Sequence, residues 1–381
     1  MQKLLHCGDF HLDSPFSSLD PERAEERRRG LAAVFSRTMQ LAADEKCDAV
    51  LIAGDLFDCS YISPDTVASM CAAMARLDCP VVISPGNHDP YTEGSVWASR
   101  RAAFPANVYI FRSPELSAYD LPGVPITVFG YAFTSDRLDA SPLTGAGSLT
   151  RPGRTSVLCA HADITSPLSK YAPVTPRELA DSGLAYAALG HIHNPPEAAT
   201  YGSTVAAYCG FPEGRGFDEE GFGAVSLVCL EEGRVSDIRR VRVGSHRYLT
   251  VRADAAGAGS DDEAAAAVAR RMADVGEPGA TSLRVVLGGD TEAEYIPDVS
   301  KIRRGLDAGG FYSLEVADDT LPLAGGRALA EDLTVRGELY RTLLPIMQKG
   351  SAEERRTAAD ALRIGLRALD GRPLFDEGGL N

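Results

Sequence analysis

Short apolar runs in the first half of this chain end, one after another, in groups of residues that can bind metal ions. Segments with a helical pattern separate the runs. The groups are Asp9-Phe10-His11, Gly54-Asp55-Leu56-Phe57-Asp58, Gly86-Asn87-His88-Asp89, His161 and Gly190-His191-Ile192-His193. Alternating strands and helices are typical of layered α/β domains, which place their ligands just beyond the strand ends. The series therefore constrains both the fold and the chemistry.

The pattern of apolar segments predicts an α/β domain of two mixed sheets, stacked face to face with helices outside. Its first strands are expected at residues 3–7, 49–53 and 80–84, and its first helices at 21–46 and 63–78. Residues 125–243 contain more strand-like segments, punctuated by Gly and Pro. Two mixed sheets stacked face to face, with helices outside, would accommodate this number of strands.

The character of the chain changes near residue 244, which predicts three parts: 1–243, 244–325 and 326–381. The second part alternates as β-α-β-α-β, with strands at 247–252, 282–287 and 312–316 and helices at 263–275 and 300–307. The third part reads as a helical hairpin. Such a hairpin either packs on its own domain or offers a docking surface to a partner helix.

The motifs supply ligands for two metal ions that share one carboxylate. Asp9 and His11 are two residues apart, and so are His191 and His193. In extended backbone, such pairs point the same way and can reach one ion. Three further ligands are expected to be Asp55, which can bridge two ions, Asn87, which offers a carbonyl oxygen, and His161, which ends a strand.

The neighbours of the expected ligands suggest catalytic roles. His88 adjoins Asn87, so both side chains cannot easily bind the same ion. A histidine beside a metal-bound phosphate can stabilise charge or protonate the leaving oxygen. Asp89 is expected to orient the His88 ring, and Asp58 to lie beside Asp55. We therefore predict His88 and Asp89 as catalytic residues.

Each motif alone has an ordinary structural explanation. A lone Asp-x-His usually means nothing, Gly-Asn-His-Asp can be a turn, and His161 can be a buried core histidine. The ordered set, with nearly every member after an apolar run, favours the metal site. The two remaining histidines, His6 and His246, are assigned to structure.

The ligand types narrow the choice of metal ion, and the net charge and the apolar content of the chain narrow its partners and its location. Nitrogen and oxygen ligands without thiolate disfavour a structural zinc site and suit Mn, Fe, Zn or Mg in a catalytic centre. The net charge of −15 argues against unspecific attraction to nucleic acid over the whole surface. No apolar stretch approaches the roughly 20 residues of a membrane span, and the first motif leaves no room for a signal peptide. We expect a cytoplasmic protein without a membrane partner.

The ordered motifs resemble those of the calcineurin-like metallophosphoesterases over residues 1–243. This resemblance implies a four-layer α/β/β/α sandwich and a centre of two divalent ions, with His88 as the catalytic histidine. The implied ligands of one ion are Asp9, His11, Asp55 and His193. Those of the other are Asp55, Asn87, His161 and His191.

Within that superfamily the chain is similar to the SbcD-type DNA repair exonucleases. The similar stretches are residues 12–16, 50–58 and 208–215. This branch implies a small α+β cap domain after the nuclease domain, manganese as the preferred metal, and DNA ends as substrate. It also implies a homodimer that works with a coiled-coil ATPase of the SbcC type, for which the C-terminal helices are the natural docking element.

The sequence thus favours a metal-dependent phosphodiester hydrolase, an exonuclease of DNA repair that uses a water activated by two metals. One alternative is a phosphodiesterase or phosphatase for a nucleotide or another small phosphoester, which the acidic surface suggests. Another is a metal-bearing scaffold without catalysis that recruits an ATPase to DNA. The native metal, the polarity of digestion and the strand preference are left open.

Overall fold

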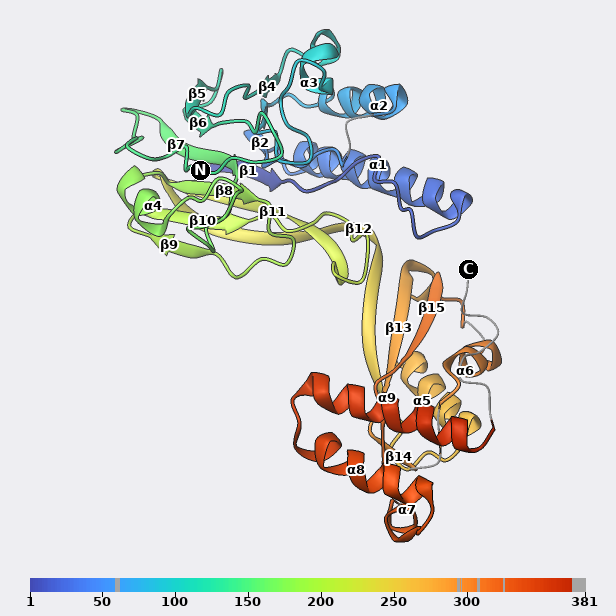
Figure 1. Cartoon of the computed structure of the whole chain (residues 1–381). Helices are drawn as coiled ribbons and strands as arrows, with labels where there is room; N and C mark the ends of the chain where they lie inside the picture. Colours follow the sequence, from blue (N-terminus) through green and yellow to red (C-terminus); the bar gives the residue numbers. More distant parts are fainter. Residues whose placement is uncertain (59–61, 293–294, 296, 307–308, 325, 372–381) are drawn as a thin grey trace. The chain divides into compact units, whose positions relative to one another are not determined.

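The computed structural model describes residues 1–58, 62–292, 295, 297–306, 309–324 and 326–371 (Figure 1). The chain divides into two compact units, Met1–Arg247 and Tyr248–Asn381. Strand β12 (Arg234–Asp254) runs through the point of division. The proposed boundaries at 243 and 325 stay predictions, and the last ten residues of the predicted third part lie outside the described residues.

One sheet of the first unit has the strand order β12-β11-β1-β2-β3-β4. The central strand β1 (Gln2–Cys7) pairs antiparallel with β11 (Gly221–Glu231) and parallel with β2 (Ala49–Ile52). Strands β3 (Val81–Ile83) and β4 (Val108–Ile110) continue the parallel part. The sheet is therefore mixed, as expected.

The other sheet of this unit has the order β5-β6-β7-β8-β10-β9. Its four inner strands are parallel, and the two edge strands run antiparallel to their neighbours. Their bounds are β5 Ser117–Asp120, β6 Ile126–Gly130, β7 Thr155–His161, β8 Tyr186–Gly190, β9 Ala199–Tyr201 and β10 Thr204–Tyr208.

The helices of the first unit begin where the sequence provides caps. Helix α1 (Pro21–Asp44) starts after Asp20, whose carboxylate accepts a hydrogen bond from the Arg23 backbone N–H. Helix α4 (Pro176–Ser182) starts with a capping box. The remaining ones are α2 (Pro64–Met74), α3 (Val96–Ser99) and the 3₁₀ turn η1 (Arg101–Ala103).

Three apolar clusters separate four layers. Because side chains alternate along a strand, Leu5 of β1 packs toward α1 and α2 while Leu4 packs toward the other sheet. In the same way Val128 of β6 lies between the sheets, and Phe129 packs on the far side with Leu179 of α4. The layers are helix, sheet, sheet and helix, which confirms the expected four-layer sandwich.

The second unit contains the expected β-α-β-α-β order. After β12 come α5 (Asp261–Ala273), β13 (Thr281–Gly288), α6 (Val299–Gly305) and β15 (Ser313–Asp318), and β13 pairs parallel with β15. The predicted end of the α6 helix at residue 307 lies outside the described residues. A 3₁₀ turn η2 (Pro278–Ala280) precedes β13, and β14 (Asp290–Glu292) pairs with β16 (Leu321–Ala324).

The last helices of the described part of the chain form the expected hairpin. Helix α7 (Arg327–Glu331) leads into α8 (Val335–Lys349) and α9 (Ala352–Leu369). Tyr340 of α8 and Leu362 of α9 share an apolar cluster into which Leu321 of β16 packs. The hairpin therefore packs on its own unit. In the described part of the chain, no helix is both long and apolar enough to cross a lipid bilayer.

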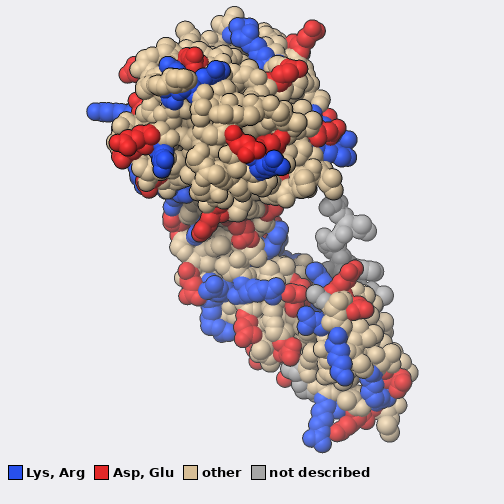
Figure 2. All heavy atoms as spheres, turned by 90° about the vertical axis from the view of Figure 1, so that its left-hand side faces the viewer, with Lys and Arg blue, Asp and Glu red and all other residues tan. Residues whose placement is uncertain are grey.

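Charged residues of both signs are mixed on one face of the molecule. On the face shown in Figure 2, Lys and Arg are interspersed with Asp and Glu. This mixture of signs makes that face unlike a basic groove for nucleic acid.

Candidate metal centre

The expected ligands follow the carboxyl ends of strands from both sheets of the first unit. Asp9 and His11 come after β1, Asp55 after β2 and Asn87 after β3, while the others end or follow β7 and β8. Because these strands are parallel within each sheet, their carboxyl ends lie along one edge. The loops after them therefore meet, although up to 184 residues separate their ligands in sequence.

Four side chains, Asp9, His11, Asp55 and His193, form what we call the first ligand group. The Nε2 atoms of His11 and His193 lie 3.3 Å apart. His11 Nε2 is 3.8 Å from Asp55 Oδ2, and His193 Nε2 is 3.8 Å from Asp9 Oδ1. These spacings suit four ligands around one ion.

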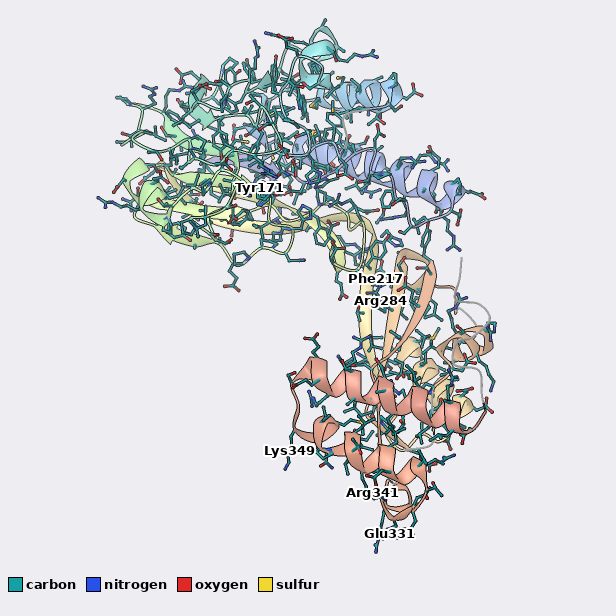
Figure 3. All side chains as sticks on the ribbon, in the orientation of Figure 1. Tyr171, Phe217, Arg284, Glu331, Arg341 and Lys349 are labelled. Carbon is teal, nitrogen blue, oxygen red and sulfur yellow. The ribbon has the colours of Figure 1, made fainter. Side chains whose placement is uncertain are left out.

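The second ligand group consists of Asp55, Asn87, His161 and His191. His161 Nε2 lies 2.8 Å from Asn87 Oδ1 and 3.4 Å from Asp55 Oδ2. The ring of His191 lies 5.1 Å from the ring of His161 and 4.6 Å from that of Tyr171, which Figure 3 labels. Asp55 contacts histidines of both groups, as a shared carboxylate must.

The backbone at these ligands is left-handed, which corrects one expectation. Asp9 and His11 have φ values of 50° and 47°, and those of Asp55 and His191 are 47° and 101°. The pair Asp9 and His11 is thus not extended, and the argument from extended i, i+2 spacing was wrong although the side chains do converge. Left-handed backbone is costly for residues other than glycine and clusters at functional sites.

Hydrogen bonds between neighbouring loops hold this backbone. The Asp9 N–H donates to the Gly54 carbonyl, and the His11 N–H donates to the Asp55 carbonyl, both at 3.0 Å. Glycine is required where the loops touch: a Cβ at Gly86 would lie 2.2 Å from Asp55 Oδ1, and one at Gly190 would lie 1.9 Å from a backbone oxygen. The loops therefore exclude side chains at these two positions.

The hydrogen bonds of His11 and His193 fit a cation in the first ligand group. His11 Nδ1 donates to Asp58 at 3.0 Å, and His193 Nδ1 donates to Glu219 at 2.7 Å. With both rings neutral, as metal-binding imidazoles are, each facing Nε2 atom carries a lone pair, and two lone pairs 3.3 Å apart suit a cation between them. Burial lowers the pKa of His11 and of His161, which favours the neutral, metal-binding imidazole.

His88 lies at the edge of the first ligand group, where its ring, with His11 and Asp58, also has a spacing that could hold a metal ion. Its Nδ1 lies 3.1 Å from Asp58 Oδ1, and its side chain is 46% exposed. The hydrogen bond to Asp58 raises the pKa of His88, which favours the protonated ring. Its backbone N–H donates to Asp55 Oδ1 at 3.0 Å, which ties the ring's position to the shared carboxylate.

Asp89 does not have the predicted contact. Its buried carboxylate accepts hydrogen bonds from the backbone N–H groups of Gly86, Leu56 and Phe57, at 2.7, 2.8 and 3.3 Å. The orienting partner of His88 is therefore Asp58. Asp89 instead holds the loop after β3 against the loop after β2, because a buried carboxylate needs donors and the local backbone supplies them.

Two residues that the motifs did not single out complete the centre. Glu219 accepts hydrogen bonds from His193 and from Arg215, whose Nη2 lies 2.7 Å from Oε1. Burial raises the pKa of Glu219, but these donors outweigh it and hold the pKa at about 2. The Arg215 Nη1 also lies 3.4 Å from Asp58 Oδ1, so one guanidinium contacts the orienting carboxylates of His11 and His193.

We expect Glu219→Gln to weaken metal binding roughly 10- to 100-fold, because partners that orient ligating histidines usually contribute that much. Competition of the protein with a metal-sensitive dye would measure the affinity. The neighbouring Glu220 is exposed, so Glu220→Gln is the matched control and should bind as the wild type does. Equal affinities in all three proteins would contradict an orienting role for Glu219.

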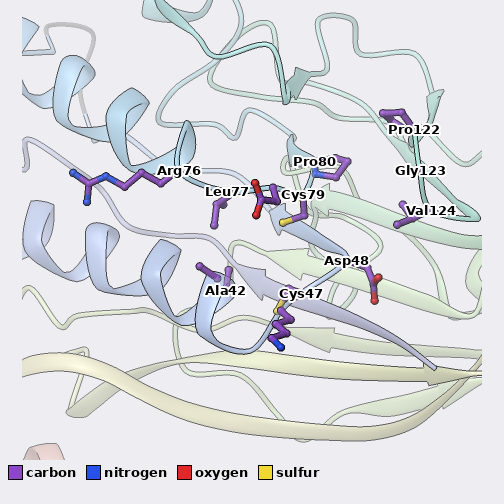
Figure 4. Close-up of a pocket in the computed structure, with 13 residues that line it drawn as sticks. Ala42, Cys47, Asp48, Arg76, Leu77, Cys79, Pro80, Pro122, Gly123 and Val124 are labelled. Carbon is purple, nitrogen blue, oxygen red and sulfur yellow. The ribbon is translucent and has the colours of Figure 1, made fainter.

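Other features lie away from this centre. A hollow lined by residues that include Cys47 and Cys79 precedes β2 and β3, at the amino ends of the strands (Figure 4). His6 lies within β1, where its Nδ1 is 2.8 Å from the Tyr186 hydroxyl, and His246 is also buried. Both histidines thus lie outside the two ligand groups.

Comparison with known proteins gives the context of this geometry. A family model described as calcineurin-like phosphoesterase matches residues 2–195. The uncharacterized metallophosphoesterase YhaO of Bacillus subtilis is 29% identical over 242 residues, 61% of this chain and 58% of that protein. The DNA double-strand break repair protein Mre11 of Aeropyrum pernix is 31% identical over 211 residues, 51% of this chain and 50% of its own.

Two further matches are a nuclease component and a solved phosphatase structure. One component of the nuclease SbcCD of Bacillus subtilis is 24% identical over 286 residues, 65% of this chain and 71% of that protein. A dimetal phosphatase from Danio rerio superposes with a TM-score of 0.43 at 12% identity, over 64% of this chain and 96% of that chain. The match to YhaO and to the Aeropyrum Mre11 covers 58% and 50% of those relatives.

Proposed function

Because this chain belongs to the calcineurin-like phosphoesterase family, we propose that it is a metal-dependent phosphodiester hydrolase that acts on DNA as an exonuclease of DNA repair. The observation that carries the proposal is the pair of ligand groups that share Asp55, with the half-exposed ring of His88 beside them. The proposed cofactors are two divalent ions, with manganese the first choice among Mn, Fe, Zn and Mg.

The ligand residues have separate tasks. The first ligand group offers two carboxylates and two imidazoles, and the second offers the shared carboxylate, an amide oxygen and two imidazoles. Two divalent ions bound there would supply charge for the phosphoryl oxygens and a water of lowered pKa. The left-handed loops fix the ligands before substrate arrives, which limits reorganisation during the reaction.

His88 is placed to act on the leaving group. Its Nδ1 is held by Asp58, so its Nε2 is the nitrogen left to face substrate. Because Asp58 raises the pKa of His88, the ring can carry a proton and donate it to the departing oxygen, or stabilise the negative charge that develops there. Asp58 has to stay ionised for this task. Burial opposes this, but hydrogen bonds from His11 and His88 keep the pKa of Asp58 well below its ordinary value.

DNA as the substrate is supported by the names of relatives. Two of them are a DNA double-strand break repair protein and a component of a nuclease. We take the β-α-β-α-β elements of the second unit as the proposed cap and the terminal hairpin as the proposed docking segment. We propose that the working form is a homodimer that associates with a coiled-coil ATPase of the SbcC type.

Incubation with linear duplex DNA tests the proposal. In the presence of Mn²⁺ the wild-type chain should shorten the DNA from its ends, and Asp55→Asn should not, because that variant loses the carboxylate common to both ligand groups. Mg²⁺, Zn²⁺ and Fe²⁺ in parallel would identify the preferred metal. Survival of the DNA in every metal, with identical behaviour of wild type and Asp55→Asn, would contradict the assignment.

The acidic charge favours one second candidate, a phosphodiesterase or phosphatase for a small phosphoester. The net charge of −15 gives a long DNA no general electrostatic attraction, whereas a nucleotide needs only the centre itself. Rates on linear DNA, cyclic dinucleotides and aryl phosphate esters separate the two. A co-purifying ATPase without hydrolysis of any of these substrates would instead favour a scaffold.

A further inference from the structure

The four ligand histidines are not held alike. Three of them donate a hydrogen bond from Nδ1 to an oxygen: His11 to Asp58, His193 to Glu219 and His161 to the Ala53 carbonyl, the last at 3.0 Å. Within the residues that the structure describes, the ring of His191 has no such oxygen partner, and its ring contacts are with His161 and Tyr171. A histidine that binds metal almost always has a hydrogen-bonded partner on its second nitrogen.

Tyr171 is firmly placed against this ring. The centroids of the Tyr171 and His191 rings lie 4.6 Å apart, with 38° between the ring planes. The backbone on both sides is tied: the Tyr171 carbonyl accepts from the Asp163 N–H at 2.9 Å, and the Ala172 N–H donates to the Leu138 carbonyl at 2.7 Å. The loop between β7 and α4 therefore fixes where the phenol ring lies.

The histidines of the two ligand groups therefore have different hydrogen-bond partners. In the first, both histidines donate to buried or half-buried carboxylates, and Arg215 contacts both of those carboxylates. An ionised partner makes the imidazole a stronger donor of electron density to a cation. In the second, His161 is held by a neutral carbonyl, and His191 has ring contacts and the electrostatic influence of nearby carboxylates such as Asp163, but no hydrogen bond from its ring to an oxygen within the described residues.

We propose that Tyr171 is a positioning residue for His191, and that the second ligand group binds its ion more weakly than the first. The proposal rests on the two-ion centre of the proposed function. A ring packed against an imidazole limits the imidazole's rotation about its side-chain torsions but adds no charge. Tyr171 thus holds the His191 ring in a position to bind the ion, whereas Asp58 and Glu219 also strengthen the electron donation of His11 and His193.

Titration of the metal-free full chain with Mn²⁺ tests this without any substrate. Calorimetry should resolve two ions per chain, one tight and one weaker. Tyr171→Ala should weaken the weaker ion about tenfold, the lower end of the effect of losing an orienting partner, and leave the tight ion unchanged. Tyr171→Phe keeps the ring and should bind both ions as the wild type does.

Substitution of a ligand shows which of the two ligand groups binds the tight ion and which binds the weaker one. Asn87 belongs to the second group alone, so Asn87→Ala should remove the weaker class. Two equal sites in the wild type, removal of the tight class by Asn87→Ala, or equal weakening of both ions by Tyr171→Ala would each overturn the proposal. Circular dichroism of each variant confirms that the fold is retained, so a change in binding reports on the centre.

The result of the Mn²⁺ titration can be told apart from the result of the DNA assay that tests the proposed function. DNA shortening in Mn²⁺ together with two equal binding sites would overturn this inference alone. Two unequal sites that respond to Tyr171→Ala as described, with DNA left intact, would support it and remove only the exonuclease assignment. Absence of any Mn²⁺ binding would overturn both.

Discussion

His88→Ala should lower the turnover of phosphodiester hydrolysis by about 10²–10⁴ while both metal ions stay bound, the usual effect of losing an acid–base or charge-stabilising group. The separation of the two effects follows from the geometry. The Nδ1 of His88 lies 3.1 Å from Asp58, and its side chain is 46% exposed, whereas the ligand histidine His11 is almost fully buried. Removing the His88 ring leaves both ligand groups complete.

Metal content measured alongside turnover decides whether His88 is a ligand. The stoichiometry by elemental analysis should equal that of the wild type. Loss of an ion in His88→Ala would make His88 a ligand, and unchanged turnover would remove it from the reaction. Asp58→Asn is the informative companion, because Asp58 contacts His11 as well as His88, so this variant should lose both metal affinity and turnover.

Trp97→Ala should destabilise the first unit by about 3–5 kcal/mol, the usual cost of truncating a buried aromatic residue. Trp97 is fully buried and packs against Phe57 and Phe104, with ring centroids 5.2 and 5.7 Å away. Its indole N–H donates to the Asp89 carbonyl, one residue after His88. The truncation therefore leaves a cavity and an unpaired carbonyl beneath the loop that carries His88.

Urea unfolding followed by far-ultraviolet circular dichroism measures this effect without the tryptophan signal. Leu168 is 89% exposed in the same unit, so Leu168→Ala is the matched truncation of a large apolar residue. It should change the unfolding free energy by no more than about 0.5 kcal/mol. Similar values for the two variants would show that burial at Trp97 contributes little.

The strands that carry the centre were predictable because their pattern is local. Continuous apolar runs mark β2 and β7, which are buried on both faces. The ligand residues could be chosen because nearly every motif follows such an apolar run. Parallel strands then bring the carboxyl ends of those runs together. No knowledge of loop conformation is needed for that step.

The details of the centre were not predictable in this way. The left-handed backbone of Asp9 and His11 depends on hydrogen bonds to the loop after β2, about 45 residues away. Asp89 was expected at the His88 ring, and Asp58 has that place. Glu219 lies in sequence 26 residues from the histidine that it orients, in a segment without a motif. A carboxylate on a loop has no periodic signature.

The sequence by itself determined the layered fold, the set of candidate ligands and the likeness to a family, since these depend on residue type and order along the chain. Only the tertiary structure decided which side chains hold those ligands: Asp58, Glu219 and Arg215 around the first ligand group, and Tyr171 beside the second. The physical reason is that orientation depends on hydrogen bonds and ring contacts between loops far apart in sequence. The loops that make these contacts come close together only once both sheets have formed.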